Sequence, residues 1–131
     1  MARTAFEELR VYRMSETLGD EVWDMVIQWP AFGQRTLGDQ LVRAADSIGA
    51  NIAEGAGRGS YRDNRRFVKI ARGSLHETKH FLRRAYRRKL ISAAQTAKLK
   101  PLLDNLAPML NSYLKSIGPR RQHEENDPTD T

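Results

Sequence analysis

The feature that most constrains the fold is a charged segment, residues 62–88, that has the periodicity of one long helix. It contains ten lysines and arginines against two acids, a net charge of +8. The whole chain carries +6, so the rest of the chain sums to −2 and the basicity is local. At 3.6 residues per turn the basic side chains recur at steps of three and four, on one side of a helix about 40 Å long.

The opposite side of this segment is apolar. Its members are Phe67, Val68, Ile70, Ala71, Leu75, Thr78, Phe81, Leu82, Ala85 and Tyr86. Such a pattern predicts an amphipathic helix that packs one side against a core and presents the other, cationic side to solvent or to a ligand.

Length and composition limit the remaining choices. A chain of 131 residues is long enough for one domain with a core and short for two. It has no cysteine, which excludes disulfides, thiolate metal sites and a cysteine nucleophile. No apolar run approaches the roughly 20 residues of a membrane span, and the N-terminus lacks a secretory apolar core. We therefore expect a cytoplasmic protein.

The rest of the chain also shows helical periodicity and no strand-like alternation, which predicts an all-α fold in one domain, residues 1–118. We expect its four helices at about 7–28, 36–54, 61–89 and 93–117. The polar residues 119–131 have no apolar periodicity and are predicted to form a disordered tail.

Residues that start or stop helices set these limits. Pro30 is expected to end the first helix and to begin a loop over residues 30–35. Ser60 and Ser92 are predicted N-caps. Pro101 and Pro108 lie inside the last helical pattern, where each removes a backbone donor, so a kink or break is expected there.

The first helix carries a second apolar seam beside its core stripe. The seam contains Leu9, Tyr12, Trp23 and Ile27. In a monomeric bundle it would leave an exposed patch, and such patches commonly mark contact surfaces. The sequence therefore predicts an oligomer interface here; a broad core stripe with a partly exposed tryptophan is the alternative.

Two motifs suggest chemistry that their surroundings do not favour. Residues 76–80, His-Glu-Thr-Lys-His, match the zinc-protease pattern HExxH, but a third ligand is missing and the neighbouring cations would repel a metal ion. The glycines of residues 55–59 suggest a phosphate-binding loop, but such a loop follows a strand and this one follows a helix. We expect no metal, no cofactor and no catalytic residue.

Polar residues of the second helix lie near its alanine-rich apolar side, where polar groups need partners. A structural polar network of Arg43, Asn51 and Glu54, with Arg72 as a further member, is expected rather than acid–base catalysis; it is either buried or formed between subunits.

The basic side has two interpretations. It is either a solvated face without a specific role or a face that binds a ligand. Acids are nearly missing from it, although like charges four residues apart destabilise a helix. Arginine outnumbers lysine eight to two, which favours phosphate or carboxylate recognition by the planar guanidinium fork. The predicted nucleic-acid-binding residues are Arg58, Arg62, Arg65, Arg66, Lys69, Arg72, Lys79, Arg83, Arg84, Arg87 and Arg88.

Three stretches also carry a resemblance to a known family. Residues 6–12 (FEELRVY), 40–55 (QLVRAADSIGANIAEG) and 70–75 (IARGSL) resemble the bacterial 23S rRNA intervening-sequence proteins. More remotely, they are similar to the accessory variability determinants of diversity-generating retroelements. Tyr12 departs from the family's usual tryptophan, and Gly49 from its frequent proline.

The resemblance implies an antiparallel up-down four-helix bundle that assembles into a ring-shaped homo-oligomer, typically a pentamer, without known enzymatic activity. In the retroelement relatives the basic ring acts with a reverse transcriptase and nucleic acid. Our leading hypothesis is thus a non-enzymatic, oligomeric bundle that binds RNA or DNA. The alternative is a protein-interaction module that docks an acidic or reverse-transcriptase-like partner; a metal hydrolase is the third.

Overall fold

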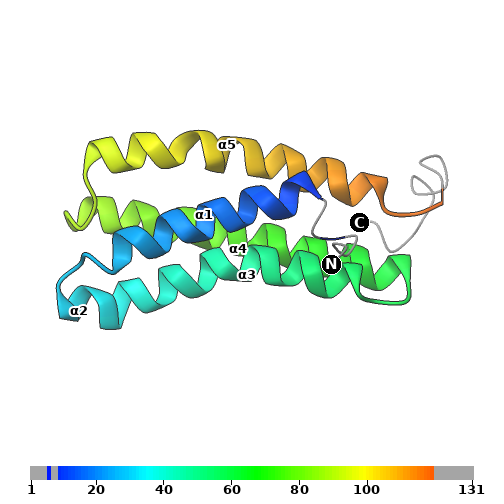
Figure 1. Cartoon of the computed structure of the whole chain (residues 1–131), viewed down its shortest axis with the longest axis horizontal. Coiled ribbons are helices and arrows are strands. Elements are labelled where there is room, and N and C mark those ends of the chain that lie inside the picture. The colour runs from blue at the N-terminus through cyan, green and yellow to red at the C-terminus, as the bar shows by residue number, and fades with distance from the viewer. Residues whose placement is uncertain (1–5, 7–8, 120–131) are drawn as a thin grey trace, which may run out of the picture.

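The computed structural model describes residue 6 and residues 9–119. Four long helices lie side by side, and successive helices run in opposite directions (Figure 1). They are α1 (Arg10–Val26), α3 (Asp39–Ala56), α4 (Tyr61–Arg87) and α5 (Ala93–Ser116). The described residues contain no strand, which confirms the predicted all-α four-helix bundle. The predicted tail after Pro119 lies outside the described residues.

The helices enclose one core. α1 packs against α3 and α5, and α4 packs against the same two helices, so α1 and α4 are diagonal to each other. Leu18, Ile48, Leu75 and Leu106, one from each helix, are completely buried. Each such side chain contributes roughly 1.5–3 kcal/mol. The apolar side of α4 is buried in this core, so the cationic side of α4 faces away from the bundle.

The contact between α3 and α4 is the most extensive in the bundle, because small residues let the two backbones approach closely. A Cβ on Gly55 would lie 2.9 Å from the Phe67 Cβ and 3.0 Å from the backbone oxygen of Asn64. Elsewhere in the same contact, the hydroxyls of Ser47 on α3 and Ser74 on α4 share a hydrogen bond of 3.0 Å.

The loop predicted for residues 30–35 is wrong. Helix resumes at once in α2 (Ala31–Gly33), widens into a π-helical turn, η2 (Gln34–Gly38), and continues into α3. Pro30 has φ −56° and ψ 153° and precedes the first helical turn, where its missing N–H costs nothing. The buried Trp29 ring lies against the glycines at the two ends of this widened turn, Gly33 and Gly38.

Both predicted N-caps are confirmed. The Ser60 hydroxyl accepts from the Asp63 backbone N–H at 3.1 Å and starts α4. The Ser92 hydroxyl accepts from the Gln95 backbone N–H, and the Gln95 side chain accepts from the Ser92 N–H, which completes a capping box for α5.

Of the kink or break predicted at Pro101 and Pro108, the break is wrong, because α5 runs through both prolines as one helix; the kink stays a prediction. Both rings lie on the solvent-exposed side of the helix. The carbonyl groups that lose their N–H partner one turn earlier therefore face water, which replaces the missing donor. Within residues 6 and 9–119, no helix has the length and apolarity that crossing a bilayer requires.

Candidate functional site

The outer side of α4 is the most strongly charged surface of the bundle. α4 carries nine lysines and arginines against two acids, whereas α1 and α3 each have a net charge of −2. The predicted binding residues that are exposed or half-exposed are Arg58, Arg62, Arg66, Lys69, Arg72, Lys79, Arg83, Arg84, Arg87 and Arg88. We call this surface the basic face. That its members bind nucleic acid stays a prediction.

Two of the predicted binding residues instead tie α4 to α5. Arg65 is buried, with 5% of its surface exposed, and its Nη1 donates to the Ile117 carbonyl oxygen at 3.1 Å. Arg72 donates from Nη1 to the Asn111 Oδ1 at 3.1 Å. The assignment of Arg65 to the exposed face is therefore wrong, because it sits at the edge of α4 where the end of α5 covers it.

An aromatic ring organises the cations at the start of α4. The guanidinium carbons of Arg58 and Arg66 lie 4.8 and 4.7 Å from the centroid of the Phe67 ring. Arg58 also pairs with Glu54 at 3.7 Å. These cation–π contacts hold Arg58, which precedes α4, beside the cations of the helix itself.

Most of the basic face lacks counter-charges. Arg62, Arg83 and Arg87 form no ion pair with any described residue. On α3 and α5, by contrast, two cations pair with acids one turn away, as Arg43–Asp39 at 3.1 Å and Lys100–Asp104 at 2.8 Å. The positive charge of these three arginines is thus not neutralised by an ion pair within the described part of the chain.

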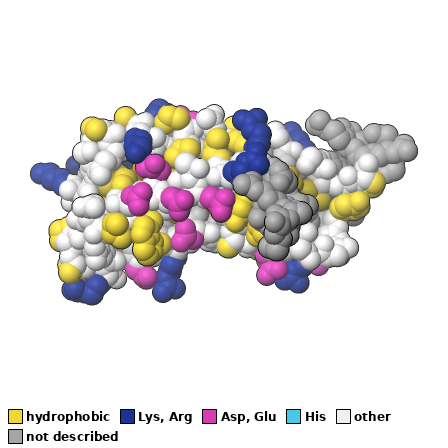
Figure 2. Space-filling model, viewed as in Figure 1, with side chains coloured by type: hydrophobic (Ala, Val, Ile, Leu, Met, Phe, Trp, Pro, Cys, Tyr) yellow, Lys and Arg dark blue, Asp and Glu magenta, His cyan; other side chains and the backbone are white. Residues whose placement is uncertain are grey.

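The face formed by α1 and α3 has the opposite charge. Figure 2 shows acidic side chains gathered in the middle of this face, and its exposed acids include Glu16, Asp20, Asp24 and Asp46. Partial burial of the Asp46 carboxyl group, and then the nearby Asp20 carboxylate, raises the pKa of Asp46. The bundle is therefore electrostatically two-sided, with its acidic side on α1 and α3.

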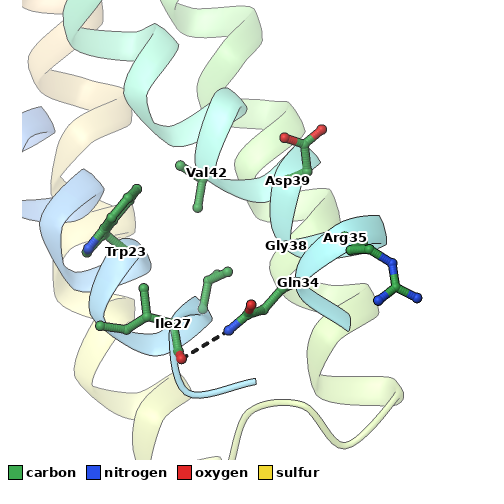
Figure 3. Close-up of a pocket in the computed structure, with 8 residues that line it drawn as sticks. Trp23, Ile27, Gln34, Arg35, Gly38, Asp39 and Val42 are labelled. Atoms are coloured by element: carbon green, nitrogen blue, oxygen red, sulfur yellow. Dashed lines mark hydrogen bonds between the residues drawn. The ribbon is translucent and has the colours of Figure 1, made fainter. Parts of the chain in front are cut away.

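An apolar groove lies beside the acidic side, between the end of α1 and η2. Trp23 and Ile27 are 54% and 51% exposed and line a hollow of about 580 Å³ together with Val42 of α3 (Figure 3). The Gln34 side chain donates to the Ile27 carbonyl oxygen at 3.0 Å, which holds η2 against the end of α1. We call this hollow the Trp23 groove.

The seam predicted as an oligomer interface is divided by the fold. Leu9 and Tyr12 are half-buried against the core, and a Cβ on Gly49 of α3 would lie 3.5 Å from the Tyr12 ring. Tyr12 is thus covered by α3 and Leu9 lies beside α5, while Trp23 and Ile27 remain exposed in the groove. Sequence reasoning missed the η2 side of this groove, which includes Gln34 and Arg35, because residues 30–35 were expected to form a loop.

The predicted polar network does not form as one unit. Asn51 donates to the Ser47 carbonyl at 2.8 Å and to the Ser47 hydroxyl at 3.0 Å, and so joins the Ser47–Ser74 bond between α3 and α4. Arg43 pairs with Asp39 on the exposed surface and Glu54 pairs with Arg58. A buried network of these three residues is therefore wrong, since Arg43 and Glu54 are exposed; a network between subunits stays a prediction.

The HExxH residues lie on the basic face. His76, Glu77 and His80 are all exposed, and the His80 ring lies edge-on to Phe81 at 5.3 Å. Across the described part of the chain, no cluster of three histidine or acidic side chains is arranged to hold a metal ion.

Comparison with known proteins places this architecture in a family. The model of the family described as "23S rRNA-intervening sequence protein" matches residues 7–112, which include α1, α3, α4 and most of α5. No curated protein matches the sequence.

Proposed function

Because the chain belongs to the family of 23S rRNA-intervening sequence proteins, we propose that it is a non-enzymatic nucleic-acid-binding bundle that uses the basic face of α4. The observation that carries the proposal is the row of arginines without ion pairs, which includes Arg62, Arg83 and Arg87. The family description, which names a segment of ribosomal RNA, favours RNA as the ligand.

The geometry suits a phosphate backbone. Arg62 and Arg87 are 25 residues apart on one helix, which corresponds to about 37 Å. Guanidinium groups at helical spacing along this line follow a polyanion and read no base sequence, because their contacts go to phosphate oxygens. Such contacts release counterions, so binding weakens steeply as salt is added.

A titration of binding to duplex DNA at increasing salt concentrations tests the proposal. If about five arginines of one protomer contact phosphates, the slope of log affinity against log salt concentration is about −4 to −5. The double variant Arg83→Glu with Arg87→Glu should make this slope less negative by about 2 and weaken binding at low salt.

A matched control is available on the other side of the bundle. Arg13 and Arg43 are exposed on α1 and α3 and do not line the Trp23 groove, so Arg13→Glu with Arg43→Glu changes the net charge equally but leaves the basic face and the groove intact. Equal weakening by both double variants would show a response to net charge alone. Absence of binding at low salt, or an unchanged slope in the α4 variant, would refute the proposal.

We further propose that the protein self-associates, so that several basic faces act together. The support is the Trp23 groove, whose large apolar side chains are half-exposed, as expected for a contact surface. A ring, with a pentamer as the expected size, would raise the overall affinity of weak sites, because a strand bound to one protomer meets the next at a high effective concentration. Light scattering of the wild type and of Trp23→Glu measures the number of subunits; a monomeric wild type contradicts self-association.

A second candidate function is a protein-interaction module. The same unpaired arginines suit carboxylates of an acidic partner, including a reverse-transcriptase-like protein. A pull-down with nuclease treatment separates the two functions, because a partner that is held through nucleic acid is released and one that is bound directly is retained.

A further inference from the structure

Tyr86 stands between two hollows at the end of the bundle where α4 turns into α5. The smaller hollow, of about 290 Å³, has an apolar floor that includes Leu82, Ile91 and Leu99. The larger one, of about 650 Å³, lies on the side of the turn and is lined by Leu90 and Gln95. Tyr86 and Ile91 line both hollows and so lie between them, and Tyr86 is the aromatic member of this pair.

The local backbone explains why this ring is exposed. α4 ends at Arg87, and Lys89 adopts the left-handed conformation with φ 63°, which reverses the chain. The Leu90 N–H then donates to the Ala85 carbonyl at 2.9 Å, and Ser92 caps α5. This tight connection leaves no residue to cover Tyr86, which is 52% exposed although the preceding residue, Ala85, is completely buried.

The rims of both hollows are cationic. Lys79 and Arg83 line the smaller hollow, and Arg87 and Lys89 line the larger one. Among the described residues no carboxylate lines either of them, whereas Asp39 lines the Trp23 groove. The site thus combines a flat aromatic ring, an apolar floor and positive charges on both sides of the ring.

We propose that this end of the bundle binds an unpaired base of single-stranded nucleic acid, stacked on Tyr86, with the flanking phosphates on Arg83 and Arg87. This inference rests on the proposed nucleic-acid binding and names its ligand more closely. A base has an apolar face that stacks on an aromatic ring and is joined on both sides to anionic phosphates. A hollow of about 290 Å³ is at the small end of ligand sites, which suits one base.

The site predicts a preference for single strands. In a duplex the bases are already stacked and paired, so only their edges and the backbone reach a protein surface. A loop or a single strand can turn a base outward into the hollow while its backbone follows the basic face of α4. Stacking also adds affinity that salt does not screen, unlike the phosphate contacts.

The test uses a short single-stranded RNA that contains one 2-aminopurine, whose fluorescence is quenched when it stacks. Wild-type protein should quench it and should bind the single strand more tightly than a duplex of the same length. Tyr86→Ala should abolish the quenching and weaken single-strand binding roughly 5- to 100-fold, while Tyr86→Phe, which keeps the ring, should preserve both.

Tyr61→Ala is the matched control. Tyr61 is 54% exposed on the same helix but lines neither hollow, so its removal should leave the quenching unchanged. The far-ultraviolet circular dichroism and the melting temperature of each variant show whether it is folded. Duplex binding should be unaffected by either tyrosine variant.

The outcomes separate the two proposals. If single strand and duplex bind equally, with normal salt dependence and no effect of Tyr86→Ala, the stacking site is refuted and the proposed function stands. Equal loss of binding in Tyr61→Ala and Tyr86→Ala would refute the assignment to this hollow. If neither nucleic acid binds at low salt, the proposed function itself fails.

Discussion

Gly55 and Gly73 should respond in opposite directions to the same substitution, because one faces the neighbouring helix and the other faces solvent. A Cβ at Gly55 would lie 2.7 Å from the Asn64 Oδ1, 2.9 Å from the Phe67 Cβ and 3.0 Å from the Asn64 backbone oxygen. A Cβ at Gly73 meets nothing within 4 Å among the described residues. Both glycines are inside helices.

The free energies follow from these contacts. In a helix alanine is favoured over glycine by about 0.8–1 kcal/mol, and Gly73→Ala should gain most of it. At Gly55 the same gain is opposed by overpacking, which costs about 1–3 kcal/mol. The Asn64 backbone oxygen cannot move without shifting α4, which puts the overpacking cost in the upper part of its range, so we expect Gly55→Ala to destabilise the bundle by about 1–2 kcal/mol net.

Thermal and urea unfolding of both variants measure the difference. For a chain of 131 residues, 1 kcal/mol corresponds to about 4 °C in melting temperature. Gly73→Ala should therefore melt a few degrees above the wild type and Gly55→Ala several degrees below it. A Gly55→Ala variant as stable as Gly73→Ala would refute the close approach of α3 and α4 at this position.

Three further substitutions test the core, the acidic side and α5. Leu106→Ala removes a completely buried side chain and should cost about 2–5 kcal/mol in urea unfolding, whereas Ile70→Ala, at 42% exposure, should cost far less. Because the pKa of Asp46 is raised, stability falls as pH rises through that pKa, so Asp46→Asn should raise the melting temperature at neutral pH, and this advantage should vanish in acid. Pro101→Ala should stabilise α5, measured as a higher melting temperature, since it restores a backbone hydrogen bond.

The sequence predicted the features that depend on local rules. The apolar and charged sides of α4, its Ser60 cap and the Ser92 cap of α5 follow from periodicity and capping chemistry. The helix after Pro30 was not predicted by these local rules, because the same proline ends one helix and starts the next. The choice depends on Trp29, whose burial against η2 is a tertiary contact.

The candidate site was harder to predict, since adjacent positions on a helix differ in what covers them. Arg65 and Arg66 are equivalent in the sequence pattern, but the end of α5 buries Arg65 and leaves Arg66 exposed. Tyr86 has apolar character and was placed on the core side, yet the tight connection after α4 leaves it exposed. Both outcomes depend on where α5 begins and ends, and the periodicity of residues within α4 does not predict these positions.

Self-association and nucleic-acid binding compete only if both use α4. A contact between the acidic side of one copy and α4 of the next would consume the basic face, whereas a contact through the Trp23 groove would leave it free, because α1 and α4 are diagonal in the bundle. The proposed functions therefore require assembly through a surface other than the basic face, and the Trp23 groove is the candidate.

This requirement predicts how Trp23→Glu behaves. The variant should be monomeric, should bind a short oligonucleotide as tightly per protomer as the wild type and with the same salt slope, and should lose affinity only for long strands that reach several protomers. Titrations with a short and a long strand at several salt concentrations measure this. If the monomeric variant binds the short strand more tightly, assembly buries the basic face, and the two functions exclude each other.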